Sequence, residues 1–229
     1  MRTVLQMPTA FQEAKREQQS LLAPLEKRAL IWLAQHAPGW VNSDHLTVLG
    51  LAALFGAGLS YWWARSNPAG LYAAIVCLAL NWLGDSLDGT LARVRNRQRP
   101  RYGFYVDHVV DEFGSLFLLG GLALSGFMSE RVALGLLIAY LMLSIEVYLA
   151  TYALGTFHLS FWKFGPTELR LLLVAGNVVL LLNPGAGIAS TGWRLFDIGG
   201  VVGIGGMTLM LIVAAARHTR ALYDAERLS

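Results

Sequence analysis

The sequence is poor in charge for its length. Charged residues make up 14% of the 229 positions, whereas hydrophobic residues make up 55%. A soluble domain carries about 25% charged residues, so a chain of this composition could not cover its surface with polar groups in water. The composition argues against a soluble enzyme domain, and the apolar content excludes an intrinsically disordered chain. The chain is therefore expected to be embedded in lipid.

Cysteine is almost absent as well. Cys77 is the single cysteine, and it lies in an apolar run. One thiol forms no disulfide within its own chain and no thiolate metal site. We expect Cys77 to be a small buried hydrophobic residue.

Six apolar runs are candidates for transmembrane helices, which take about 20 residues to cross a bilayer. They are 46–64, 70–93, 104–127, 132–154, 168–183 and 196–216. The backbone must satisfy its own hydrogen bonds in hydrocarbon, and this requires helices. The sequence therefore predicts an all-α bundle of six transmembrane helices over residues 41–229. Its 24 glycines suit close helix packing in lipid.

The first 40 residues are expected to form a separate N-terminal segment. Between Phe11 and His36, leucine and isoleucine side chains are interleaved with cations such as Lys27 and Arg28. This pattern predicts an amphipathic helix in the membrane interface, broken near Pro24. The alternative is a tail that folds on its own, away from the bundle.

The cations predict an orientation. With six spans, 15 of the 18 Lys and Arg residues fall on one side of the membrane, leaving only Arg65, Arg131 and Arg194 on the other. The richer side is expected to be cytoplasmic, and it holds both termini. The cluster of arginines between the second and third spans is a short turn at the membrane, so nucleic-acid binding is not expected.

Four aspartates occupy positions where charge is costly. Asp85 and Asp88 lie three residues apart near the end of the second span, and Asp107 and Asp111 lie four apart near the start of the third. Each pair shares one face of its helix. The short loop between the spans makes the helices antiparallel neighbours, so both pairs are expected at one depth near the cytoplasmic surface. Charged groups in such positions are usually functional.

Four carboxylates in a medium of low dielectric constant need cations to stay ionised. Oxygen ligands without cysteine indicate a hard ion such as Mg²⁺ or Mn²⁺. Four aspartates carry enough charge for two ions, and two-metal sites serve phosphoryl transfer. Gly89 lets a ligand approach the backbone, and Arg93 can bind a phosphate with two hydrogen bonds. The pattern predicts metal-assisted attack on a diphosphate at the membrane surface.

Two other interpretations stay open at this point. The aspartates could form salt bridges with the loop arginines and have only a structural role. They could also belong to a divalent-cation transporter or binding protein, although such proteins more often place acidic residues at mid-bilayer on broken helices.

The segment from Asp85 to Asp111 reads D-x2-D-G-x2-A-R-x9-G-x3-D-x3-D. This pattern resembles the signature of the CDP-alcohol phosphotransferase family. The resemblance implies a membrane enzyme of phospholipid biosynthesis that transfers a substituted phosphate from a CDP-linked donor to an alcohol and releases CMP. It also implies that Asp85, Asp88, Asp107 and Asp111 hold two metal ions, and that Asp111 is the general base. By the same resemblance the active site opens to the cytoplasm, and homodimers are common among relatives.

The resemblance extends to the residues expected to bind the donor. Gly89 and Arg93 are expected to contact the CDP portion, with Ala92 small enough to pack against it. The stretch Asp44-His-Leu-Thr47, at the start of the first span, is similar to the nucleotide-contacting stretch of the family.

Two donor classes compete. The length of the chain favours CDP-diacylglycerol, whose phosphatidyl group passes to a small alcohol. Asp107-His108 and the stretches around Thr151–Thr156 and Gly165–Glu168 are similar to choline/ethanolamine phosphotransferases, which move a head group to a lipid alcohol. The candidate acceptor contacts are Glu146, Lys163, Glu168 and Arg170.

Overall fold

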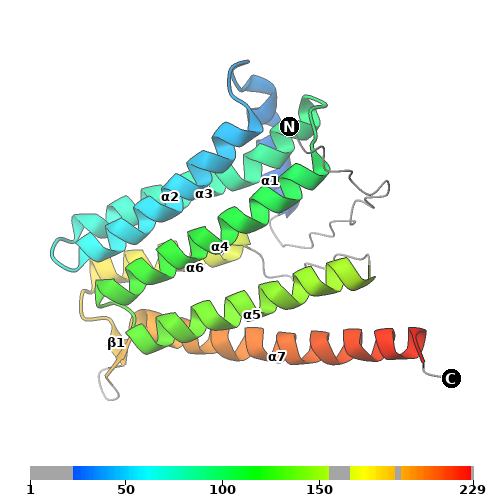
Figure 1. Cartoon of the computed structure of the whole chain (residues 1–229). Helices are drawn as coiled ribbons and strands as arrows, with labels where there is room; N and C mark the ends of the chain where they lie inside the picture. Colours follow the sequence, from blue (N-terminus) through cyan, green and yellow to red (C-terminus); the bar gives the residue numbers. More distant parts are fainter. Residues whose placement is uncertain (1–22, 155–165, 189–191, 228–229) are drawn as a thin grey trace, which may run out of the picture.

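A computed structural model describes residues 23–154, 166–188 and 192–227 of the chain. The described part is helical apart from one short antiparallel hairpin (Figure 1). The elements are α1 (Ala23–His36), α2 (Ser43–Ala64), α3 (Ala69–Val94), α4 (Pro100–Ser125), α5 (Glu130–Leu154), α6 (Pro166–Leu182), β1 (Gly187–Ile188), β2 (Trp193–Arg194) and α7 (Leu195–Ala225). The prediction of an all-α bundle is confirmed.

The helices form two connected groups. α3 and α4 pack on α2, while α5 and α7 lie side by side, and α4 also packs on α5 (Figure 1). α1 and α6 both pack against α3. The helices are therefore held together chiefly through α2 and α3 in one group and through α5 in the other.

Within the described residues, five helices are long and apolar enough to cross a membrane: α2, α3, α4, α5 and α7. The sixth predicted span, α6, is apolar but has only 17 residues, near the lower limit for a bilayer crossing. α7 continues to Ala225, beyond the predicted end at residue 216. The predicted span ended where charged residues begin. At about 1.5 Å per residue, however, the 31 residues of α7 extend over about 46 Å, which is longer than the hydrocarbon core of a bilayer.

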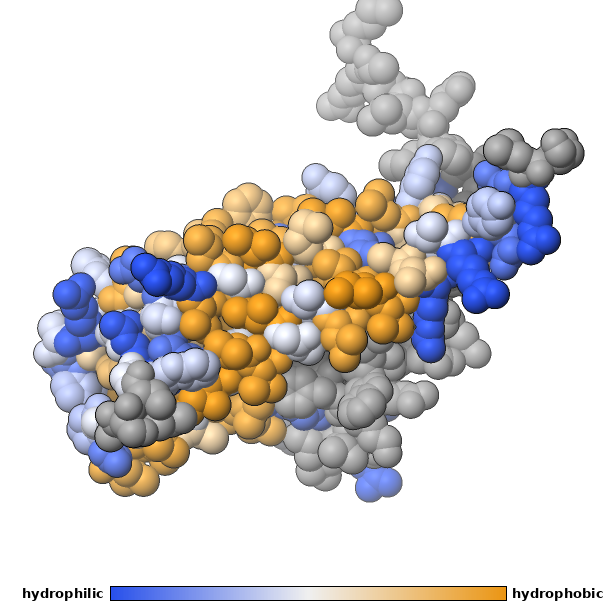
Figure 2. Space-filling model, turned by 90° about the horizontal axis from the view of Figure 1, so that it is seen from below, coloured by the Kyte–Doolittle hydropathy of each residue, from blue (hydrophilic) through white to orange (hydrophobic). Residues whose placement is uncertain are grey.

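The surface agrees with a lipid environment. Large hydrophobic side chains are exposed along the helices, including Val48, Leu124, Leu134 and Leu209. On the face drawn in Figure 2, hydrophobic residues gather in a broad middle zone and hydrophilic residues lie toward both ends. Such a zone would be costly in water, and it matches the core of a bilayer.

The three cations predicted to lie opposite the others share one end of the bundle. Arg65 follows α2, Arg131 lies in the first turn of α5, and Arg194 precedes α7. The ends of α3, α5 and α7 lie at the other end, with the start of α4 (Figure 1).

Glycines allow α2 to approach both of its neighbours. A Cβ atom added to Gly84 of α3 would stand 2.6 Å from the carbonyl oxygen of Leu46 and 2.7 Å from the nitrogen of Gly50. A Cβ atom on Gly121 of α4 would stand 2.2 Å from the carbonyl oxygen of Gly58. These distances leave no room for a side chain, so close backbone packing fixes α3 and α4 on α2. Cys77, expected to be buried, lies on α3 and is only partly buried.

The N-terminal helix docks on the bundle instead of folding apart. Leu30 and Ala34 of α1 are buried in one cluster with Leu87 and Leu91 of α3. The structure describes α1 from Ala23 onward, so the break expected near Pro24 stays a prediction. The part of the predicted amphipathic helix before residue 23 lies outside the described residues.

Candidate active site

Asp88 is the most deeply buried of the four predicted metal-binding aspartates, with 8% exposure. The Thr47 hydroxyl of α2 donates a hydrogen bond to its Oδ2 at 2.8 Å, and the backbone N–H of Gly89 donates to its Oδ1 at 2.5 Å. The Ser43 hydroxyl donates to the backbone carbonyl of Asp88 at 3.0 Å. Donors on both oxygens satisfy a charged group that burial would otherwise penalise, and they fix it between α2 and α3.

Asp85, one turn earlier on α3, forms an ion pair with Arg170 of α6. The Arg170 Nη2 lies 2.6 Å from Asp85 Oδ2. The Nε of the same guanidinium donates to Asn81 Oδ1 at 2.7 Å, and Asn81 Nδ2 donates to the Gly50 carbonyl at 3.0 Å. A continuous set of polar contacts therefore joins α6, α3 and α2 beside the aspartates.

Asp107 and Asp111 lie on α4. Asp88 is within electrostatic range of Asp85 and Asp107. Asp107 is partly buried, whereas Asp111 is exposed and lies within electrostatic range of Tyr140 on α5. The structure thus places Asp85 and Asp88 near the end of α3 and Asp107 near the start of α4, with Asp111 one turn further along α4.

The relation between α3 and α4 differs from the prediction. The sequence indicated direct antiparallel neighbours, but in the structure each helix packs mainly against α2. The reason is the close backbone contact that Gly84 and Gly121 permit with α2. The link that α2 makes to the aspartates is the Thr47 hydroxyl, which contacts the Asp88 carboxylate.

The side-chain atoms of the predicted site are of the kind that binds a hard cation. Among the described residues no three carboxylate, imidazole or thiol groups stand close enough together to share one metal ion. The polar side-chain atoms of Asp85, Asp88, Asp107 and Thr47 are nonetheless all oxygens, which are the ligands that Mg²⁺ and Mn²⁺ prefer. These oxygen ligands are therefore of the right chemical type for such an ion.

The predicted donor-binding residues on α3 form one edge of the site. The Arg93 guanidinium folds back toward Gly89, so that a Cβ atom on Gly89 would stand 3.4 Å from Arg93 Nη1. Arg93 Nη2 also donates to the Thr90 hydroxyl at 3.1 Å. Gly89 and Ala92 are partly buried, and Arg93 is exposed. A cation is therefore presented to solvent next to the aspartates.

Two arginines of the loop between α3 and α4 hold neighbouring loops. Arg95 donates to the backbone carbonyls of Ala37 and Pro38, at 2.9 and 3.0 Å, and to that of Val41. Arg99 forms an ion pair with Asp44 at the start of α2. Asp44 is not one of the four aspartates of the salt-bridge interpretation, and Asp85 pairs with Arg170 of α6, which is not a loop arginine.

The predicted acceptor contacts lie in separate places. Glu146 of α5 pairs with His218 of α7, with 2.6 Å between Oε1 and Nδ1. Its Oε2 is buried and has no hydrogen-bond partner among the described residues. Glu168 is partly buried in the first turn of α6, before Arg170. Lys163 lies outside the described residues.

Three polar residues of this region were not singled out from the sequence. Glu26 of α1 accepts hydrogen bonds from α3 and α6, and Asn81 is 3% exposed. Glu112 of α4 accepts a hydrogen bond from the Tyr148 hydroxyl at 2.6 Å. Glu112 and Asn81 could have been found as polar groups within apolar spans, but an acid on an interfacial helix carries no such signal.

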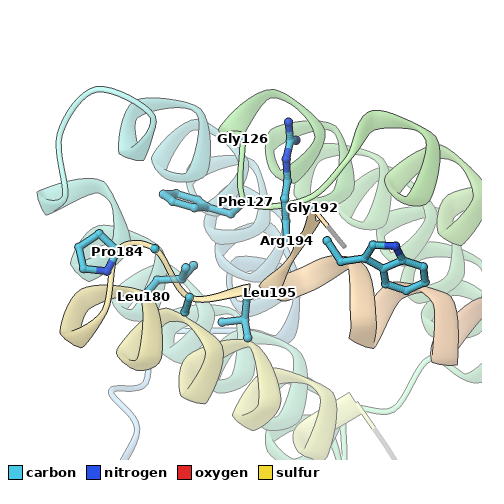
Figure 3. Close-up of a pocket in the computed structure, with 10 residues that line it drawn as sticks. Gly126, Phe127, Leu180, Pro184, Gly192, Arg194 and Leu195 are labelled. Carbon is cyan, nitrogen blue, oxygen red and sulfur yellow. The ribbon is translucent and has the colours of Figure 1, made fainter. Parts of the chain in front are cut away.

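Two cavities of the described residues lie at the opposite end of the bundle. One, of about 230 Å³, is lined by the loop after α4, the end of α6 and the hairpin before α7 (Figure 3). In it Arg194 donates to the Met128 carbonyl at 2.6 Å. The other, of about 670 Å³, lies at the end of α2 and includes Trp62 and Trp63. Neither is lined by the predicted aspartates.

Comparison with protein families gives a match over most of the chain. The family described as CDP-alcohol phosphatidyltransferase matches residues 40–217, which is more than half of the chain. The matched range contains α2 to α6, most of α7 and all four aspartates.

Proposed function

Because the chain belongs to the CDP-alcohol phosphatidyltransferase family, we propose that it transfers the phosphatidyl group of CDP-diacylglycerol to an alcohol and releases CMP. At family level it is a membrane-bound transferase of substituted phosphate groups, of the kind that makes phospholipids. The observation that carries the finer proposal is the position of Asp88. It is a buried carboxylate held by Thr47 and Gly89, with Asp85 and Asp107 within electrostatic range.

The family generally uses divalent metal ions. We assign two such ions, Mg²⁺ or Mn²⁺, to Asp85, Asp88, Asp107 and Asp111. When bound, they would neutralise the charge of the donor diphosphate and of the leaving CMP. Gly89 and Arg93, with Ala92 packed beside them, would bind the nucleotide portion together with Asp44 and Thr47.

Asp111 is the proposed general base. It takes the proton of the acceptor hydroxyl as the acceptor oxygen attacks the phosphorus that carries the diacylglycerol group. The bond from that phosphorus to the bridging oxygen breaks, and CMP leaves with the bridging oxygen and its electron pair. The exposure of Asp111 supports this role, because an acceptor must reach the carboxylate from outside the bundle. Positioning and charge neutralisation would supply most of the rate.

Arg170 is proposed to act beside the acceptor as the counter-ion of Asp85. The pair sits where α6 meets α3, and the Arg170 side chain is only 15% exposed. Glu168, two residues earlier on the same helix, would also contact the acceptor. Glu146 and Lys163 complete the proposed acceptor side, with Glu146 oriented by His218.

A choline/ethanolamine type of reaction is the second candidate. It is favoured by α5, where the residues after Arg131 include acidic and neutral polar groups but no lysine or arginine through Leu154. A phosphorylated acceptor would need cations there. In this reaction the head group of a CDP-amino alcohol would pass to a lipid alcohol.

The test is CMP release by purified protein in detergent with Mg²⁺, offering CDP-diacylglycerol or CDP-choline against a panel of alcohols. We expect release with CDP-diacylglycerol and one class of alcohol, and a loss of about a hundredfold or more in Asp111→Asn, in the range of general base catalysis. Asp224→Asn is the matched control, because Asp224 is exposed and pairs only near the end of α7 with Arg220 and Arg227. Release from CDP-choline alone would select the second candidate. Binding or transport of metal ions, with no CMP release from any pair of donor and alcohol, would support a cation transporter or binding protein.

We also propose that the aspartate end of the bundle and both termini face the cytoplasm. In a Cys77→Ser background, Ser66→Cys lies in the α2–α3 loop and Arg97→Cys lies in the α3–α4 loop. A membrane-impermeant maleimide is expected to label Ser66→Cys in intact cells, and Arg97→Cys only after permeabilisation. The reverse pattern would overturn the orientation.

A further inference from the structure

The Glu26 carboxylate joins three helices with one oxygen. Oε1 accepts hydrogen bonds from the Trp82 indole at 2.8 Å and the Ser86 hydroxyl at 3.2 Å, both on α3. It also accepts one from the Thr167 hydroxyl of α6 at 3.1 Å. Hydrogen bonds to a carboxylate are stronger than those between neutral groups, so Glu26 is a strong link between α1, α3 and α6.

This link lies directly beside the polar contacts of Arg170. On α6, Thr167 and Arg170 are three residues apart and share a face. On α3, the partners of Arg170 are Asn81 and Asp85, each next in sequence to a partner of Glu26. The two sets of contacts therefore form neighbouring layers between the same two helices.

The start of α6 depends on this layer. α6 begins at Pro166, so Thr167 is in its first turn and Arg170 follows one turn later. A contact that holds Thr167 on α3 sets the direction in which α6 leaves its first turn. That direction determines where the Arg170 guanidinium meets α3.

The packing of α1 on α3 fixes the position of the helix turn that carries Glu26. Leu30, four residues after Glu26, is buried against α3 on the same helix face, and Ala34 follows one turn later. Lys27 and Arg28 are exposed. The carboxylate thus projects from the docked face of the interfacial helix.

We propose that Glu26 is a positioning residue: through Thr167 it fixes the start of α6 on α3, and so holds the Arg170 guanidinium on the Asp85 carboxylate. The effect on rate rests on the proposed function, because Asp85 must take part in the reaction. On this view the interfacial helix is part of the catalytic centre as well as a membrane contact.

The kinetic test compares Glu26→Ala, Glu26→Gln and Arg170→Ala with the double variant, by CMP release at varied donor concentration. We expect Glu26→Ala to lower kcat about tenfold to a hundredfold, as small misplacements can. Glu26→Gln should recover most of this loss, because its amide oxygen still accepts hydrogen bonds. The double variant should be no slower than Arg170→Ala alone, because Glu26 acts through Arg170. Lys27→Ala is the matched control and should equal the parent protein.

A second measurement needs no turnover. In a Cys77→Ser background, nitroxide labels at Arg28→Cys on α1 and Leu172→Cys on α6 report the distance between the helices by pulsed EPR. Both positions are exposed. We expect a narrow distance distribution that broadens in Glu26→Ala and stays narrow in Glu26→Gln.

The outcomes separate the two proposals. An unchanged kcat in Glu26→Ala would overturn the positioning role. So would a double variant whose loss of kcat equals the product of the losses in the two single variants. An unchanged EPR distribution would overturn the link itself. If the parent protein releases no CMP from any pair, the proposed function fails, and the EPR distribution alone then decides whether Glu26 holds α6.

Discussion

Asp88→Asn is expected to lower CMP release by about a thousandfold, which corresponds to about 4 kcal/mol of lost transition-state stabilisation. The substitution keeps the size of the side chain but removes its charge. Asp88 accepts hydrogen bonds on both oxygens, from Thr47 and from the Gly89 backbone. An amide offers one oxygen and one NH₂ group, so one of these donors would face another donor. The loss therefore combines a missing metal ligand with a misplaced side chain.

The measurement is the steady-state rate of CMP release at saturating Mg²⁺, with thermal unfolding recorded on the same preparations. Asp224→Asn is again the control, since it makes the same chemical change on an exposed side chain of α7 that pairs with Arg227. An Asp88→Asn protein that is folded and retains more than about a tenth of the parent rate would contradict the assigned role, because a lost metal ligand costs more than one factor of ten.

The helices could be predicted from local pattern. Six apolar runs matched α2 to α7 within a few residues at most ends, since hydrocarbon requires a continuous apolar stretch. The end of α7 was missed because its last turns carry Arg217 and Arg220 outside the bilayer, where helix formation no longer needs apolar residues. The short hairpin before α7 had no apolar run or alternation long enough to indicate it.

The site could be predicted only in part. The spacing of Asp85 and Asp88 placed both near the end of α3, as observed, because three residues make almost one helical turn. The ion pair between Asp85 and Arg170 joins positions far apart in sequence. No local pattern specifies which distant helix supplies a counter-ion. That choice depends on packing, here of α6 on α3.

The central position of α2 among the helices also depends on packing between distant segments, so it could not be predicted from local pattern. The sequence showed 24 glycines but not which of them meet another backbone. The contacts of Gly84 and Gly121 with α2 explain why α3 and α4 each pack mainly on α2. These two glycines therefore help to set the positions of the helices that carry the four aspartates.

The packing of α4 on α2 leads to the second large prediction. Gly121→Ala is expected to lower the free energy of unfolding by about 1 to 3 kcal/mol, the usual cost of overpacking. The new Cβ atom would stand 2.2 Å from the Gly58 carbonyl oxygen and 2.3 Å from its Cα. Both are backbone atoms that no rotamer change can move. α4 must therefore shift away from α2 and carry Asp107 with it, so CMP release should fall as well.

The adjacent residue provides a close control. A Cβ atom on Gly120 meets nothing within 4 Å, so Gly120→Ala adds the same methyl group to the same helix turn without a clash. Alanine also favours helix over glycine by up to about 1 kcal/mol, so this variant should be as stable as the parent or slightly more stable. Thermal unfolding in one detergent, followed by circular dichroism, compares the three proteins. Equal midpoints for Gly121→Ala and Gly120→Ala would show that α2 and α4 do not pack through Gly58 and Gly121. A lower midpoint confined to Gly121→Ala, with reduced CMP release, would tie the separation of α3 and α4 to catalysis.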